Sequence, residues 1–273
     1  MAVTQDNFKN FTISPIEKSR LSDYKTLFGE TYQDFSPSIE YLKWLYFENP
    51  IGDVVGFDAC DNGVVVAHYA CIPTRVDSFE GLSLLALNTA THPGYQGRGL
   101  LKVLANRTYD KAGSNFAGVF GVANSKAVNA LVRHLNFVQV GNLELRFGKL
   151  NREKKGSRIY SEGEIAWRSR CPNKNLKRKK IGTSTEKVTV KPFGPLIRIS
   201  ALIHLMDVPE RTSDYLQPRL NYGLTLDWQK NKRPKIFLPK RFKPSPLALV
   251  YRALNDPNYS KLTSWSFPDF DAL

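Results

Sequence analysis

The chain lacks any long apolar run and has few cysteines. No segment approaches the roughly 20 consecutive apolar residues that a membrane-spanning helix requires. The opening residues, MAVTQDNFKN, contain no apolar core of the kind found in signal peptides. The three cysteines, Cys60, Cys71 and Cys171, are widely spaced and form no CxxC pair, which argues against a structural zinc site. We therefore expect a cytoplasmic protein without a metal centre.

Acidic residues are scarce relative to basic ones, but only in the second half of the chain. The net charge is +14, yet residues 1–148 hold 13 Lys and Arg against 14 Asp and Glu. Residues 149–191 hold 14 against 4, and residues 219–243 hold 8 against 1. This excess favours an anionic partner: a phosphorylated or nucleotide-linked substrate, an anionic membrane surface or nucleic acid. A solvated basic face is the alternative.

Nucleic acid is the least favoured of these partners, because no array interleaves aromatic and basic residues. Composition is otherwise that of a globular protein, with 42% hydrophobic and 12% aromatic residues among 273. This length is enough for one large domain or two modest ones.

Hydrophobic periodicity predicts helices and strands in the first half of the chain. Helices are expected over 16–32, opened by Ser14-Pro15, and over 36–47. Three strands follow, and Asp61-Asn62-Gly63 predicts a hairpin turn between the first two. The expected strands cover 54–60, 64–76, 82–91, 116–123 and 137–150, and further helices cover 99–112 and 125–135. This order predicts the α/β class, with one mixed sheet flanked by helices.

Beyond residue 150 the pattern weakens. Residues 151–192 are polar, basic and poor in periodicity, which predicts a basic linker or insertion. Strands are expected over 223–228, 235–238 and 262–267, and a helix capped by Ser245 over 246–254. We therefore predict a catalytic domain over 8–150, the linker or insertion over 151–192, and a smaller, substrate-binding lobe over 193–273.

The segment 87–102, LNTATHPGYQGRGLLK, is the most informative part of the chain. A strand runs through a proline-marked turn into a glycine-rich turn that opens directly into a helix. The first N–H groups of a helix have no intrahelical partner, and the helix dipole adds positive charge, so such a turn can hold a pyrophosphate. Gly97 and Gly99 allow close approach of the backbone, and Arg98 and Lys102 add charge. A tight turn without a ligand is the alternative.

Known phosphate-binding motifs do not fit this turn, because neither GK[ST] nor GxGxxG is present. The stretch from Gln96 to Leu101 instead resembles the acetyl-CoA signature Q/R-x-x-G-x-G/A of the GNAT (GCN5-related N-acetyltransferase) superfamily. Leu101 departs from it, because glycine or alanine is usual at that position. Thr91-His92-Pro93 is similar to the V-x-P element that precedes the signature.

A second element downstream also resembles the family. Residues 124–127, NSKA, look like its Asn-x-x-Ala helix start, and residues 135–137, LNF, look like its terminal LGF. The resemblance covers about half the chain. Residues 43–50, KWLYFENP, and 244–247, PSPL, are similar to a GNAT branch associated with bacterial surface-polysaccharide biosynthesis.

The resemblance implies a GNAT-like fold and acetyl-CoA as cosubstrate. The backbone of residues 89–91 would pair with the pantetheine arm, and residues 97–102 would hold the pyrophosphate. Asn124 would lie near the thioester, although its position before Ser125 equally predicts a helix N-cap. The residues so assigned to acetyl-CoA are Thr89, Ala90, Thr91, Gln96, Gly97, Arg98, Gly99, Leu100, Leu101, Lys102 and Asn124.

The family's usual catalytic side chains are missing. The family often places a glutamate on the strand before the signature, where 83–87 reads SLLAL, and a tyrosine on the helix after Asn124, where Leu131 and Val132 stand. Catalysis can rest on positioning alone. The remaining candidate acid–base residues are His68, His92, Asp269 and Asp271, the two aspartates if the C-terminal tail folds back onto the site.

The leading functional prediction is transfer of an acetyl or short acyl group from acetyl-CoA to a primary amine of an amino sugar or sugar conjugate. The basic second half would then hold an anionic carrier such as a nucleotide diphosphate. Two alternatives remain: the same chemistry on an amino acid or protein amine, and a non-catalytic CoA-binding or interaction module.

Overall fold

The computed structural model describes residues 11–32, 36–150, 155–172, 176–181, 184–193, 197–206, 222–231, 236–237 and 247–266. Its largest sheet has seven strands in the order β1-β2-β3-β4-β5-β14-β6. Only β4 and β5 are parallel; the other neighbours are antiparallel. These strands are β1 (Thr12–Pro15), β2 (Val55–Asp61), β3 (Val64–Thr74), β4 (Leu82–Thr91), β5 (Phe116–Asn124), β14 (Leu247–Ala253) and β6 (Val138–Asn142).

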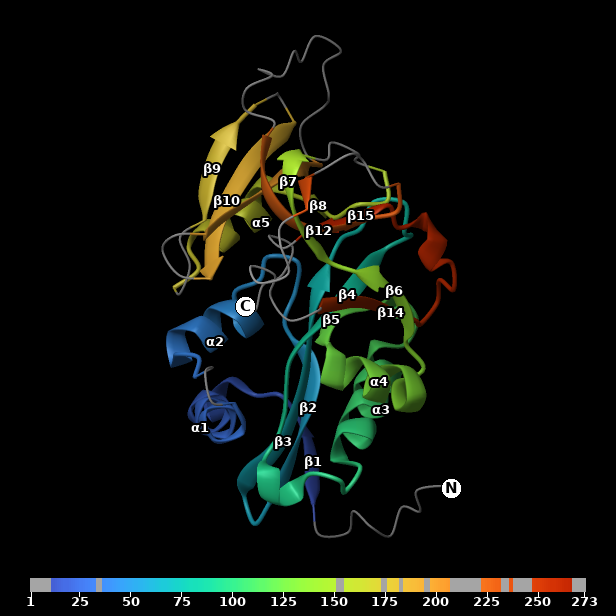
Figure 1. The fold of residues 1–273 in the computed structure, drawn as a ribbon. Coiled ribbons are helices and arrows are strands. Elements are labelled where there is room, and N and C mark those ends of the chain that lie inside the picture. The colour runs from blue at the N-terminus through green and yellow to red at the C-terminus, as the bar shows by residue number, and fades with distance from the viewer. Residues whose placement is uncertain are drawn as a thin grey trace.

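Helices cover both faces of the main sheet (Figure 1). Helices α1 (Leu21–Thr31) and α2 (Ile39–Phe47) pack on one face, whereas α3 (Leu100–Ala112) and α4 (Ser125–Leu135) pack on the other. The apolar residues of the central strands alternate accordingly. Leu85 packs with α1 and α2, and its neighbour Leu84 packs with α3. The predicted α/β class with a mixed sheet is confirmed.

The first hairpin forms as predicted, but the first helix begins later than predicted. Asn62 and Gly63 have positive φ values of 48° and 85°, as the two-residue turn between β2 and β3 requires. Ser14 and Pro15 do not open a helix. They belong to β1, where Pro15 stands opposite Phe57 at the end of the edge strand. A short 3-10 turn, η2 (Lys18–Arg20), then leads into α1.

The segment 246–254 was predicted as a helix, and this prediction is wrong. Residues Leu247–Ala253 form β14, which lies between β5 and β6 in the main sheet. Leu249, Val250 and Tyr251 are fully buried there. A short apolar run has the same composition in a buried strand and in a buried helix, so periodicity did not separate the two. The proline at position 246, directly after Ser245, favoured the helix.

The strand predicted over 137–150 is two strands, β6 and β7 (Glu144–Lys149), which belong to different sheets. Leu143 lies between them, and its N–H donates to the carbonyl of Leu247. Strand β7 pairs with β12, so the chain leaves the main sheet at this point. The second sheet has the order β13-β7-β12-β15, and its other strands are β13 (Ile236–Phe237), β12 (Tyr222–Gln229) and β15 (Ser264–Ser266).

The polar segment predicted as a linker or insertion carries regular structure over most of its described residues. A third sheet has the order β8-β11-β10-β9, with β8 (Ile159–Tyr160), β11 (Ile197–Leu205), β10 (Thr185–Phe193) and β9 (Lys177–Lys180). Helix α5 (Glu162–Ser169) begins with a capping box between Ser161 and Glu164. The ring of Trp167 stacks on that of Trp44 of α2 with centroids 4.5 Å apart, which joins α5 to the first half of the chain.

Candidate active site

The parallel strands β4 and β5 separate partway along their length. Their backbone pairing ends at Ala86 and Gly121. Within the described residues, the two strands do not pair beyond that point. Strand β4 nevertheless continues to Thr91 beside β3, and β5 continues to Asn124 beside β14. The backbone edge of residues 87–91 that faces β5 is therefore without a strand partner in the described structure, and an extended ligand could pair with it.

A bulge in β4 lies just beyond this separation. Tyr69 alone on β3 stands opposite both Asn88 and Thr89, and Asn88 has a φ of 47°. Regular alternation would place Asn88 on the same face as Ala86, toward α3. Its amide Nδ2 instead donates to the hydroxyl of Tyr46 on α2, at 3.2 Å. The bulge has thus redirected the Asn88 side chain to the face covered by α1 and α2.

The glycine-rich turn follows β4 and the 3-10 turn η3 (Pro93–Tyr95). Gly97 and Gly99 both adopt left-handed conformations, with φ values of 76° and 80°. Among the described residues, no group accepts from the five N–H groups of Gly97 to Leu101. The N–H of Lys102 is different, because it donates to the carbonyl of Gly99 at 3.1 Å. A Cβ built on Gly97 meets nothing within 4 Å, so there is room beside these donors.

The side chains of the turn hold its shape. Gln96 donates from Nε2 to the carbonyl of Thr91 at 3.1 Å, which ties the turn to the end of β4. The guanidinium of Arg98 donates to the carbonyl of Gly94 at 3.1 Å and lies 4.8 Å from the ring centroid of Tyr95. With five open N–H groups at the start of α3, the turn suits a diphosphate.

Asn124 caps helix α4, as its position predicted. Its Oδ1 accepts from the N–H of Ala127 at 2.9 Å, which is the N-cap geometry. Because Asn124 is also the last residue of β5, it lies at the β5 side of the opening in the sheet. The N-cap role is therefore confirmed, and contact with a thioester stays a prediction.

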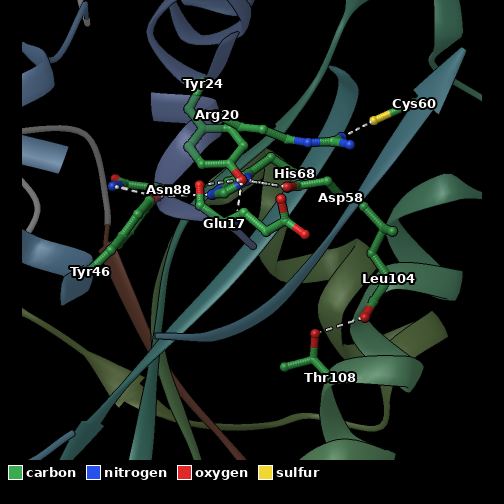
Figure 2. A network of polar contacts seen from close by, with 10 residues as sticks. All are labelled: Glu17, Arg20, Tyr24, Tyr46, Asp58, Cys60, His68, Asn88, Leu104 and Thr108. Carbon is green, nitrogen blue, oxygen red and sulfur yellow. Dashed lines mark hydrogen bonds and ion pairs between the residues drawn. The ribbon is translucent and has the colours of Figure 1, made fainter. Parts of the chain in front are cut away.

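His68 is fully buried and belongs to a polar network behind β4 (Figure 2). Its Nδ1 is 2.6 Å from Oδ1 of Asp58, and its Nε2 is 2.9 Å from the hydroxyl of Tyr46. Asp58 also accepts from the hydroxyl of Tyr24 at 2.6 Å. The side chains of Asp58, His68, Tyr46 and Asn88 therefore form a continuous chain of hydrogen bonds that ends at the bulge in β4.

Burial keeps both phenols of this network protonated. Burial raises the pKa of Tyr46 far above its usual range. The pKa of Tyr24 is also raised, first by burial and then by the negative charge of Asp58. Tyr46 and Tyr24 are therefore hydrogen-bond donors at neutral pH.

His92 is placed differently from His68. Its Nδ1 accepts from the N–H of Gly94 at 3.1 Å and so caps η3, and its Nε2 is 3.7 Å from the carboxylate of Glu30. The two histidines do not lie in one network. Asp269 and Asp271, the other acid–base candidates, lie outside the described residues.

Sequence reasoning missed Tyr46, Asp58 and Asn88. One signal was present for Asp58, because it is a carboxylate inside an otherwise apolar strand. No comparable signal marked Asn88, since a bulge redirects its side chain. Tyr32 was also missed. Its hydroxyl donates to the carbonyl of Thr89, so the end of α1 contacts β4 beside the bulge.

The described residues offer neither a metal site nor a membrane-spanning helix. Within the described ranges, no cluster of three or more His, Cys, Asp or Glu side chains could hold a metal ion. None of the helices described here combines the length and the apolar character needed to cross a bilayer.

No protein-family model and no curated protein matches the sequence. Solved structures do match. A conserved Enterococcus faecalis protein, a probable N-acyltransferase, superposes with a TM-score of 0.58 and 9% identity over 90% of this chain and 73% of that chain. A candidate acetyltransferase from Pyrococcus horikoshii gives a TM-score of 0.53 and 10% identity, over 91% of this chain and 92% of that one.

A GNAT family N-acetyltransferase from Escherichia coli, crystallised with CoA, matches 48% of this chain and 69% of that chain, with 18% identity and a TM-score of 0.40. The fold is established by the first two of these matches. The chain therefore shares the mixed α/β fold of these two proteins.

Proposed function

We propose that this protein is an acetyl-CoA-dependent N-acyltransferase. The observation that carries the proposal is the run of five N–H groups from Gly97 to Leu101, none of which donates to a described group. This run leads into α3, and it follows a strand whose edge at residues 87–91 has no strand partner in the described structure. The donors would bind the pyrophosphate, and the edge of residues 89–91 would pair with the pantetheine arm. Arg98, Lys102 and Asn124 would complete the acetyl-CoA site.

The proposed reaction forms an N–C bond and breaks a C–S bond. The amine lone pair attacks the thioester carbonyl, the C–S electron pair leaves with sulfur, and one amine proton passes to the thiolate or to solvent. His68 would act through Tyr46, since it is fully buried. His92, Asp269 and Asp271 remain the candidates for direct proton transfer. Positioning of the amine supplies the rest of the rate enhancement.

We propose an amino sugar or sugar conjugate on an anionic carrier as the acceptor, as in surface-polysaccharide biosynthesis. Three exposed lysines of β9, Lys177, Lys179 and Lys180, support an anionic acceptor, whereas Arg178 of the same strand is paired with Glu162 and Glu186. In this proposal the protein is cytoplasmic, residues 8–150 supply most of the acetyl-CoA site, and the basic segments after residue 150 bind the acceptor.

Two measurements on the full chain test the proposal. Calorimetric titration with CoA should show saturable binding. Thiol release from acetyl-CoA should then be stimulated by glucosamine or a UDP-linked amino sugar more than by free amino acids or a peptide N-terminus. Absence of CoA affinity would reject the acyltransferase assignment. CoA binding without thiol release on any amine would instead favour a non-catalytic CoA-binding module.

A further inference from the structure

The network behind β4 has one consistent hydrogen-bond direction when Asp58 is ionised and His68 is neutral. A carboxylate only accepts, so the hydroxyl of Tyr24 and Nδ1–H of His68 both donate to Asp58. With the His68 proton on Nδ1, Nε2 is an acceptor, and the single proton of Tyr46 must point to it. The oxygen of Tyr46 can then only accept, so the Asn88 group 3.2 Å away must be the NH₂.

This direction fixes the orientation of the Asn88 carboxamide. Its Nδ2 is turned inward to Tyr46, and its carbonyl Oδ1 is the opposite end of the same planar group. Among the described residues, none donates a hydrogen bond to Oδ1 of Asn88. The side chain is half-buried, unlike those of His68 and Tyr46, and it lies two residues beyond the point where β4 and β5 separate.

Different groups lie on the two faces of the main sheet near Asn88. Helix α3, with the open N–H groups at its start, packs on one face. Asn88, Tyr46 and the end of α1 lie on the other. A ligand whose diphosphate lies at α3 and whose arm follows the open edge of β4 would therefore bring its distal end close to Asn88.

We propose that Asn88 binds the amine of the acyl acceptor through Oδ1, and that Asp58, His68 and Tyr46 are positioning residues that hold its carboxamide in this orientation. This inference rests on the proposed acyltransferase function. A carbonyl oxygen accepts an N–H of the amine and thereby directs the nitrogen lone pair toward the thioester. The bulge in β4 is what brings an asparagine to this face, and the buried network determines which of its two ends is presented.

The test compares Asn88→Ala, Tyr46→Phe and the double variant with a matched control, Tyr69→Phe. Tyr69 is a phenol of β3 with 1% exposure, and its hydroxyl is 2.7 Å from that of Tyr109, on the opposite face of the sheet. Its substitution also removes a buried phenol hydrogen bond but removes no side-chain contact of Asn88. Each variant is assayed for thermal unfolding, CoA affinity, and kcat and KM with the panel amine that wild type acetylates fastest.

We expect Asn88→Ala to lower kcat/KM for the amine by roughly 100-fold and Tyr46→Phe by about tenfold, whereas Tyr69→Phe lowers it less than about threefold. CoA affinity should change less than about twofold in all variants. Because Tyr46 acts through Asn88, the double variant should be no slower than Asn88→Ala alone.

Two results would overturn the inference. One is Asn88→Ala with wild-type kcat/KM, and the other is a double variant whose loss is the product of the two single losses. The proposed function survives either result, provided that the wild type binds CoA and acetylates the amine. If the wild type fails to bind CoA, or to acetylate any amine of the panel, both the inference and the proposed function are rejected.

Discussion

Gly97 and Gly63 have similar backbone conformations but lie in different environments. Their φ values are 76° and 85°, and a Cβ on either meets nothing within 4 Å. A left-handed alanine costs about 1 kcal/mol, so Gly97→Ala and Gly63→Ala should destabilise the fold to a similar extent. Only Gly97 belongs to the turn with open N–H groups. Of the two variants, we expect only Gly97→Ala to raise the Kd for CoA, by roughly tenfold, in calorimetric titration.

Equal effects of these two substitutions on CoA affinity would contradict the placement of the diphosphate. The same conclusion would follow if the two variants bound CoA with equal affinity but differed in stability. Both variants are therefore measured for unfolding as well as for binding.

Cys71 is a buried thiol whose ionisation should make the stability of the fold depend on pH. Its side chain is fully buried on β3, and burial raises the pKa of its thiol to about 12. The native thiol keeps its proton where the unfolded thiol, with a pKa near 8.5, loses it. The free energy of unfolding should therefore fall by about 1 kcal/mol between roughly pH 8.5 and pH 9.5. In Cys71→Ala this part of the pH dependence should disappear in urea unfolding curves; its persistence would exclude Cys71 as the source.

The sequence predicted some site residues well and others not at all. The positive φ values of Gly97 and Gly99 and the N-cap role of Asn124 follow from local rules on glycine and on capping, so one short segment sufficed. The contact between Asn88 and Tyr46 joins α2 to a bulge in β4. Because such a contact depends on tertiary packing, no local sequence pattern predicted it.

Helices α2 and α5 form the clearest link between elements distant in the chain. Trp44 and Trp167 stack, and each indole Nε1 donates to the backbone carbonyl of the other residue, at 2.9 Å and 3.0 Å. We expect Trp167→Ala to lower the free energy of unfolding by about 3–5 kcal/mol in urea titrations followed by circular dichroism. Trp167→Phe retains an aromatic ring and should cost less than half as much. Equal losses in the two variants would show that stacking contributes nothing.

Helices and strands could be predicted where they are long and where residues at their ends mark the boundaries. Helix α4 was predicted over the residues that form it, because Asn124 marks its start and its apolar residues have a helical period. Helix α5 was missed because it has eight residues in a polar, basic segment. Strand β14 was mistaken for a helix because its hydrogen-bond partners, β5 and β6, lie far away in the sequence.

The main sheet is assembled from both ends of the described chain. Strand β14 pairs with β5 from Leu247 to Ala253 and with β6 on its other side. A fragment of residues 1–150 would leave facing edges of β5 and β6 unpaired. We expect this fragment to lack cooperative thermal unfolding and to aggregate in size-exclusion chromatography. Addition of a peptide of residues 247–266 should restore cooperativity, and a scrambled peptide should not.

Cooperative unfolding of the fragment alone would show that β14 is dispensable to the sheet. Loss of cooperativity that the peptide does not reverse would instead assign the defect to the other segments after residue 150.

The position of β14 also has a consequence for biosynthesis. Gly118 and Ala253 are paired neighbours in the sheet, so the slot beside β5 stays open while the ribosome makes all the residues between them. A nascent chain with such a gap displays hydrogen-bonding edges for many seconds at ordinary rates of translation. Slower elongation after residue 150 would lengthen the exposure of these edges to chaperones and to aggregation alike.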